Sequence, residues 1–199
     1  MNLHAWINLC WQGKYRHLPW LVIGKGPSFS RLNSGHLEKN NTIGLNHVVQ
    51  HVPHLDVMHI IDWPVIHDCK SELNRADFVV MPERPNVNFQ PADRPQDAPT
   101  EFEAMRQSSR VITYDRKAGP ADIHPLGSVC AWRFSVEAAI CVLAVAGVKV
   151  IHTIGIDGGM SYAQEFNMQP LTNGQPSFDG QWAAIDKIAD MYGLQIIRL

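Results

Sequence analysis

Short apolar runs alternate with helical patterns along most of the chain, and this alternation restricts the fold more than any other sequence feature. The run at 21–23 is typical, because it is as short as a strand and apolar at every position. Strands of this kind are buried on both faces, and strand–helix–strand units arrange them in parallel. The sequence therefore predicts an α/β protein with a modified Rossmann-like domain, whose mostly parallel sheet has about seven strands flanked by helices.

The predicted strands cover residues 21–23, 42–46, 56–61, 78–81, 110–114, 148–154 and 194–199. The predicted helices cover 27–38, 47–51, 64–75, 128–146 and 178–192. Ser128 is expected to cap the helix over 128–146, which Gly147 ends. We expect one nucleotide-binding domain over 1–199, with an N-terminal helical extension at 1–19 and long loops at 82–109 and 158–177. The second loop is expected to act as a lid over a ligand.

Composition limits the partners of the protein. The net charge is −2 and the chain has no basic run, so nucleic acid is not an expected partner. The cysteines lack metal-ligand or redox spacing, and no stretch is long enough to cross a bilayer, so we expect a cytoplasmic protein. The N-terminal tryptophans favour a helix packed on the domain, while a peripheral membrane contact stays open as the alternative. A homo-oligomer also stays open.

A glycine-containing turn follows the first predicted strand and consists of Gly24, Lys25, Gly26, Pro27 and Ser28. In an open parallel sheet, ligands bind beyond the carboxyl ends of the strands. Glycine lets the backbone approach a phosphate, a helix start offers free N–H groups, and the lysine adds positive charge. The turn has neither the P-loop pattern nor the full dinucleotide fingerprint. Its position nevertheless predicts a nucleotide-phosphate site.

Polar or aromatic residues also follow other predicted strands, at Asn46, Asp62, Trp63, Asp157 and Gly158. The Asn46 amide can donate to and accept from a base or ribose. Asp62 suits a ribose hydroxyl or a cation, and Trp63 suits stacking on a base. These residues are expected to converge on one edge of the sheet.

The histidines are weaker candidates. His124 precedes the long predicted helix and is the best-placed group for acid–base chemistry near neutral pH. His47 and His51 have the spacing to share a metal, but no third ligand is apparent, so no metal site is predicted. His59 and His152 lie inside predicted strands and are expected to be packed and hydrogen-bonded.

The chain resembles the bacterial sialyltransferases of glycosyltransferase family 42, and more loosely the pterin-pyrophosphokinase-like Rossmann proteins. The blocks that carry the likeness are 21–28 with Asn46, 127–131 with 150–157 and 161–163, and 180–182. The resemblance implies a lidded Rossmann fold that binds a CMP-activated sugar. It assigns the nucleotide to the 24–28 turn and Asn46, and the phosphate or sugar carboxylate to Gly127 and Ser128. It assigns Tyr162 a hydrogen bond to the departing phosphate.

The sequence departs from that family at several of its functional positions. Lys25 replaces an asparagine, and His124 aligns with an arginine of the family. The family's Thr-Ser-Gly becomes residues 126–128, and a second phosphate-binding tyrosine has no counterpart. The histidine taken as the general base aligns with Gln181, which cannot accept a proton.

Three functions follow as hypotheses. The first is a glycosyltransferase without a required cofactor, which passes the sugar of a nucleotide-sugar to the hydroxyl of a saccharide acceptor. Lys25 would then stabilise the leaving phosphate with help from Tyr162, and His124 or Asp157 would replace the base. The second is a phosphotransferase with Mg²⁺ held by Asp62 and Asp157. The third is a nucleotide-binding protein without turnover.

Overall fold

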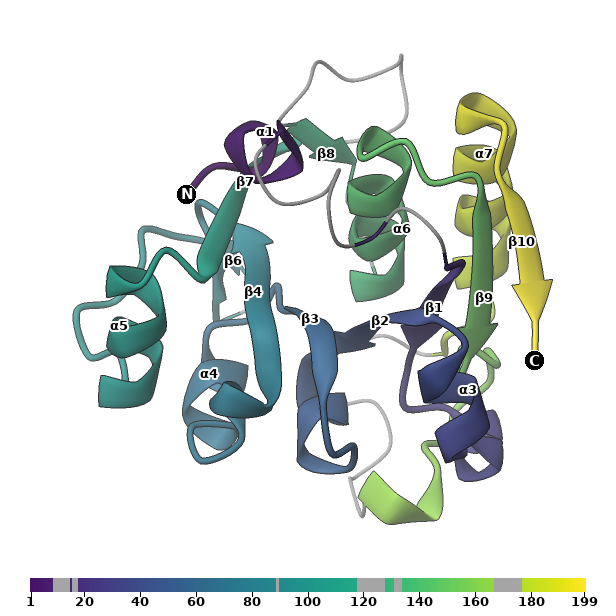
Figure 1. Cartoon of the computed structure of the whole chain (residues 1–199), viewed down its shortest axis with the longest axis horizontal. Coiled ribbons are helices and arrows are strands. Elements are labelled where there is room, and N and C mark those ends of the chain that lie inside the picture. Colours follow the sequence, from purple (N-terminus) through teal and green to yellow (C-terminus); the bar gives the residue numbers. More distant parts are fainter. Residues whose placement is uncertain (9–14, 16–17, 89, 118–127, 131–133, 167–176) are drawn as a thin grey trace.

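The computed structural model of the protein describes residues 1–8, 15, 18–88, 90–117, 128–130, 134–166 and 177–199, and only the backbone of 117 and 128–130. The central element is an eight-stranded sheet in the order β10-β9-β1-β2-β3-β4-β7-β8 (Figure 1). Every neighbouring pair of strands is parallel. The strands are β1 (Trp20–Ile23), β2 (Asn41–Leu45), β3 (Leu55–His59), β4 (Ala76–Pro82), β7 (Val111–Lys117), β8 (Ser128–Cys130), β9 (Val150–Ile154) and β10 (Gln195–Arg198). The predicted fold class is confirmed.

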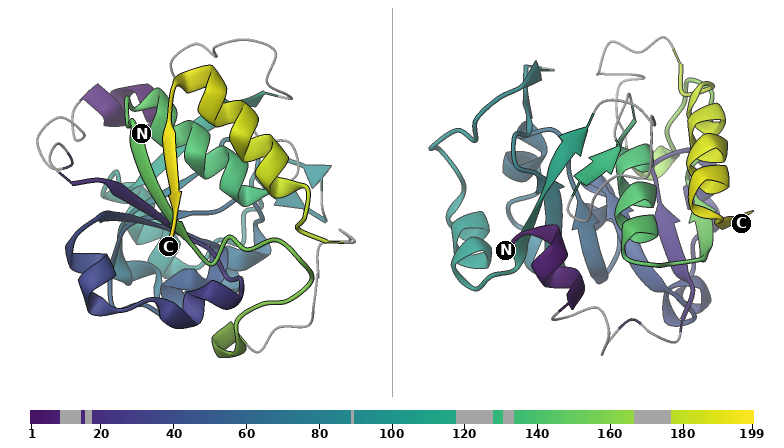
Figure 2. Two further views of the ribbon diagram at one scale, coloured as in Figure 1. Left: turned by 90° about the vertical axis from the view of Figure 1, so that its right-hand side faces the viewer. Right: turned by 90° about the horizontal axis from the view of Figure 1, so that it is seen from above.

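Two apolar layers cover the two faces of this sheet. Alternate strand residues point to opposite faces, so Trp20 and Val22 belong to one buried cluster and Leu21 and Ile23 to the other. The first layer holds α6 (Ser135–Val145) and α7 (Gln181–Tyr192), which lie together on one face (Figure 2). The second layer holds the 3-10 helices η3 (Asn46–Gln50), η4 (Leu73–Arg75) and η5 (Gln164–Phe166), with α4 (Pro64–Asp68) and α5 (Thr100–Gln107).

The N-terminal segment belongs to the first layer. Helix α1 (Leu3–Trp6) buries the Trp6 side chain completely, and its ring packs edge-on against Phe78 at a centroid distance of 5.6 Å. The N-terminal amino group donates to the Val111 carbonyl at 2.9 Å. In the described part of the N-terminal segment, the short helix Leu3–Trp6 thus packs on the sheet through Leu3 and Trp6. None of the helices in the described part of the chain is long and apolar enough to span a membrane.

Several predicted helices are shorter than expected. The range 27–38 is divided into η2 (Pro27–Arg31) and α3 (Ser34–Glu38), because the Asn33 side chain caps α3 by accepting from the His36 N–H. The range 64–75 is divided into α4 and η4. The helix expected over 128–146 begins only at Ser135, and Ser128 lies in β8 beside Asp115 of β7. Ser128 is therefore not a helix cap, because the extended backbone at Phe134 separates β8 from α6.

The two expected loops contain regular structure. Within 82–109 the chain forms a hairpin of β5 (Asn86–Val87) and β6 (Gln90–Pro91), and then α5. The loop prediction is wrong for α5, which two fully or almost fully buried side chains, Phe102 and Met105, anchor to the second layer. Within 158–177 the structure describes η5, while 167–176 lie outside the described residues. The lid therefore stays a prediction.

Candidate functional site

The strand order identifies one position in the sheet where a ligand is expected. From β1 the chain adds β2, β3, β4, β7 and β8 in one direction, and then returns to place β9 on the other side of β1. Ligands of open α/β sheets bind at such a reversal, beyond the carboxyl ends of the strands. Here the segments after β1 and β9 meet. The Gly24 N–H donates to the Ile154 carbonyl and the Gly26 N–H to the Gly155 carbonyl, both at 2.8 Å.

The two glycines of the first turn are required by this contact between segments. A Cβ on Gly24 would collide with the Gly155 carbonyl oxygen, and one on Gly26 would collide with the Asp157 carboxylate. Asp157 Oδ2 accepts from the Ser28 N–H at 2.8 Å. The N–H groups of residues 24, 26 and 28 are thus paired inside the protein. This corrects the reason for the glycines: they let two loops approach each other, and a phosphate at Ser28 N would have to displace Asp157.

Lys25 carries the positive charge of this turn. Its Nζ lies 4.6 Å from the centre of the Tyr162 ring and 3.5 Å from His47 Nδ1. The Lys25 carbonyl accepts from the Ala163 N–H at 2.8 Å, which holds the Tyr162 segment beside the turn. Burial lowers the pKa of Lys25 from 10.5 to about 8, and burial raises the pKa of Tyr162. Lys25 and Tyr162, which were expected to act on the same leaving phosphate, therefore contact each other.

His47 connects Lys25 to a carboxylate that sequence reasoning did not select. His47 Nε2 lies 3.0 Å from Asp68 Oδ2 at the end of α4. Burial lowers the pKa of His47, and the hydrogen bond to Asp68 opposes this shift. The His51 ring instead packs edge-on against the Phe166 ring, with the ring centroids 4.5 Å apart. His47 and His51 thus have different partners.

Asn46 combines two unusual features at the end of β2. Its backbone is left-handed, with φ of 53°, which costs a residue other than glycine some conformational energy. Its Nδ2 donates to Ser135 Oγ at 3.3 Å in the first turn of α6. Its Oδ1 is buried and has no hydrogen-bond partner among the described residues. Because a buried acceptor without a partner is costly, the Asn46 Oδ1 indicates a missing hydrogen-bond donor at this edge of the sheet.

Asp62 belongs to a second group of hydrogen-bonded side chains, separate from Lys25, His47 and Asp68. Asn86 Nδ2 donates to Asp62 Oδ1 at 2.9 Å, and Arg116 Nη1 donates to Asn86 Oδ1 at 3.0 Å. Sequence reasoning missed Asn86 and Arg116, because one lies in the hairpin and the other extends β7 beyond its expected end. Trp63 does not fit its predicted role in stacking. Its side chain is only 4% exposed and packs edge-on against Phe102.

The remaining predicted residues lie farther along the chain. Gly158 has a positive φ of 82°, which requires glycine at this bend. Gln181 opens α7 and is only 5% exposed, so its amide is a buried group of the first helical turn. His124 and Gly127 lie outside the described residues, and only the backbone of Ser128 is described. The roles predicted for these residues stay predictions.

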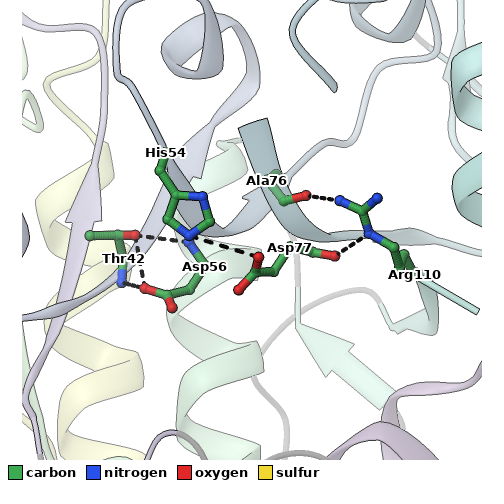
Figure 3. Close-up of polar contacts among 6 residues, drawn as sticks. All are labelled: Thr42, His54, Asp56, Ala76, Asp77 and Arg110. Carbon is green, nitrogen blue, oxygen red and sulfur yellow. Dashed lines mark hydrogen bonds and ion pairs between the residues drawn. The ribbon is translucent and has the colours of Figure 1, made fainter. Parts of the chain in front are cut away.

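Mg²⁺ held by Asp62 and Asp157 stays a prediction, because such an ion is usually bound by one or two carboxylates together with substrate phosphates. Among the described residues, the group of three side chains that could hold a metal ion is His54, Asp56 and Asp77, whose ligand atoms lie within 4.8 Å of one another (Figure 3). These residues precede or open β3 and β4, so they lie at the amino-terminal edge, opposite the candidate site.

Internal contacts account for much of this second group. Thr42 donates to Asp56 Oδ2 through both its N–H, at 2.8 Å, and its Oγ1, at 3.0 Å. His54 Nε2 lies 3.8 Å from Asp77 Oδ1, and both side chains are partly exposed. These contacts connect β2, β3 and β4 at their amino-terminal ends. The group is therefore a structural link of the sheet and separate from the candidate site.

Comparison with known proteins identifies the fold. No protein-family model and no curated protein sequence matches the chain. A structure of a sialyltransferase CST-II variant in complex with CMP is similar over 92% of this chain and 81% of that chain, with a TM-score of 0.51 and 10% identity. An α-2,3-sialyltransferase from Campylobacter jejuni in apo form gives 92% and 76% coverage, a TM-score of 0.47 and 11% identity. The first comparison confirms the expected sialyltransferase-like fold.

Proposed function

We propose that the protein is a glycosyltransferase that binds a nucleotide-activated sugar, with a CMP-sugar favoured, and transfers the sugar to an acceptor hydroxyl. The observation that carries this proposal is the buried Oδ1 of Asn46, which has no partner among the described residues and lies at the carboxyl edge of the sheet, beside the reversal of strand order. This edge also holds Lys25 and Tyr162. The fold is shared with a sialyltransferase whose structure contains CMP.

Asn46 would recognise the nucleoside. Its Oδ1 can accept from the exocyclic amine of a cytosine or from a ribose hydroxyl, which would pair an atom that no described residue pairs. The Tyr162 hydroxyl would donate to the departing phosphate, as the sequence resemblance implies. Its raised pKa keeps that hydroxyl protonated at neutral pH, as a donor must be.

A binding protein without turnover is the second candidate, and Gln181 is the observation that favours it. This residue occupies the position at which the resemblance expects a catalytic histidine, and its buried amide cannot take a proton. Formation of free CMP from a CMP-sugar in the presence of a saccharide acceptor would exclude this candidate. Activity that a chelator abolishes would instead support the phosphotransferase alternative.

A thermal-shift comparison of CMP, CDP, UDP, GDP and ATP tests the proposed nucleotide site. A ligand at about 100 times its Kd stabilises the native state by about 2.7 kcal/mol. For a chain of this size, that corresponds to a rise in Tm of roughly 5–10 °C. We expect the largest rise with CMP. The proposal is contradicted if none of the five nucleotides raises Tm.

Two matched variants locate the effect. Asn46→Gly removes the side chain without backbone strain, because glycine accepts a positive φ. Asn88→Gly makes the same change at another left-handed asparagine, with φ of 50°, in the hairpin region. The CMP-induced rise should shrink in Asn46→Gly and persist in Asn88→Gly. Equal rises in both variants would remove Asn46 from the site.

A further inference from the structure

Lys25 has more specific surroundings than a phosphate-binding lysine needs. Its ammonium group lies over the face of Tyr162 and 3.5 Å from His47 Nδ1. His47 in turn contacts Asp68 through Nε2 at 3.0 Å. A carboxylate accepts hydrogen bonds only, so Nε2 carries the hydrogen and Nδ1 presents its lone pair to Lys25. The three side chains therefore form one chain, Asp68–His47–Lys25, assembled from α4, η3 and the turn after β1.

The charges around Lys25 oppose the effect of its burial. Burial disfavours the ammonium form and is the largest effect, while the charges of Asp62 and Asp68 favour that form. His47 is held neutral by its own burial. The result is a pKa of about 8 in place of 10.5. At pH 7 the neutral amine is then about 300 times more abundant than in an ordinary lysine.

We propose that Lys25 is the proton acceptor of the transfer reaction and that His47 and Asp68 are its positioning residues. This inference rests on the proposed function and supplies the base that Gln181 cannot provide. The acceptor oxygen bonds to the anomeric carbon of the donor sugar. The bond from that carbon to the phosphate oxygen breaks, and its electron pair leaves on CMP. The proton of the acceptor hydroxyl passes to the neutral Lys25 amine, which releases it to water after the products leave.

The arrangement assigns Lys25 a different task from the phosphate contact expected from sequence. The Lys25 amine lies 3.5 Å from His47 Nδ1, and the N–H groups of residues 24, 26 and 28, which a phosphate would need, are already paired inside the protein. A positioned acid–base group is worth about a hundredfold or more in turnover. We therefore expect Lys25→Arg to reduce turnover at least a hundredfold, because an arginine keeps the charge but has no neutral form at accessible pH.

The titration of Lys25 can be measured without a substrate. Protein labelled with ¹³Cε-lysine gives one NMR signal per lysine, and the signal that Lys25→Arg removes is that of Lys25. We expect its midpoint near pH 8. Asp68→Asn removes a charge that favours the ammonium form, so the midpoint should move to lower pH. Asp186→Asn on the exposed side of α7 is the control and should leave the midpoint unchanged. A midpoint near 10.5, or one that Asp68→Asn does not lower, overturns the proposal.

Pyridoxal phosphate with borohydride separates this inference from the proposed function. The aldehyde reacts with neutral amines, and reduction fixes the product for peptide mapping. Preferential labelling of Lys25 at pH 7 supports the reactive amine, and protection by CMP supports the nucleotide site. Labelling without CMP protection would contradict the nucleotide site but would still support a reactive amine at Lys25. Absence of preferential labelling would overturn the assignment of Lys25 even if CMP raises Tm.

The pH profile of activity completes the test. If Lys25 is the base, kcat/KM should rise with pH up to about 8 and then level, because the neutral amine is the active form. In Asp68→Asn this rise should occur at lower pH, by the same shift that NMR measures. A purely structural role for Asp68 would lower activity without moving the profile. An unmoved profile alongside a shifted Lys25 signal would refute the role of Lys25 as base.

Discussion

His59 makes the stability of this protein sensitive to mild acid. The side chain is fully buried between the layers, and its Nε2 lies 3.0 Å from the Tyr114 hydroxyl. Burial lowers the pKa of His59 from 6.5 to about 3. In the unfolded chain His59 binds a proton below about pH 6.5, whereas in the folded chain it does so only below about pH 3. Folding stability is therefore full above pH 6.5 and is lost as the pH falls from 6.5 towards 3.

The size of the effect follows from these two pKa values. At pH 5, protonation of His59 in the unfolded chain lowers the free energy of unfolding by about 2 kcal/mol relative to its value above pH 6.5. Each pKa unit is worth about 1.4 kcal/mol. Urea unfolding at pH 7.5 and pH 5 measures this loss in the wild type and in His59→Gln. The glutamine keeps a group that can bond Tyr114 but does not titrate. We expect the wild type to lose about 2 kcal/mol more than the variant between the two pH values.

Tyr114→Phe is the control for this experiment. It removes the hydroxyl that faces His59 but keeps the ring that buries it, and burial is the cause of the lowered pKa. The variant should be less stable at both pH values and should keep the acid-dependent loss. The reasoning is refuted if His59→Gln and the wild type lose equal free energy between pH 7.5 and pH 5.

Two further substitutions test the packing around the site and the N-terminus. Gly24→Ala should lower the free energy of unfolding by about 3 kcal/mol, because its Cβ meets the Gly155 backbone. The Cβ of Gly180→Ala meets no neighbour, so this control should change stability little. Urea unfolding compares the two variants, and equal losses would refute the tight contact at Gly24. Trp6→Ala should lower the free energy of unfolding by about 4 kcal/mol, since it empties a fully buried site. A loss below about 1 kcal/mol in urea unfolding would show that α1 is not part of the cooperative fold.

The strands could be predicted closely because burial on both faces leaves a local signal. The predicted strand at 21–23 lies within β1 (Trp20–Ile23). The predicted strand at 148–154 contains β9 (Val150–Ile154). The order of the strands in space has no such signal, since parallel crossovers can add a strand on either side. The reversal that returns β9 to β1 was therefore not predicted, although the importance of the carboxyl edge was.

The helices were predicted less well, because tertiary contacts override helical periodicity. Residues 128–130 read as the start of a helix, yet they pair with β7 as an added edge strand. Helix α5 has only two buried anchors, Phe102 and Met105, and it follows a proline-rich stretch that masked its pattern. In both cases the deciding partner is distant in sequence, so no local window contains the information.

The candidate site shows the same limit more sharply. Lys25, Asn46 and Tyr162 could be selected from sequence because each lies just beyond a strand or inside a motif block. Asp68 could not, since it ends a short helix and its partner His47 is 21 positions away. A lysine considered without its neighbours suggests a permanently charged group that binds a phosphate. The same lysine, buried and held by a neutral histidine that a carboxylate fixes, becomes a group that can exchange its proton near neutral pH. The residue type was thus readable from the sequence, while its protonation behaviour depends on neighbours that only the folded chain brings together.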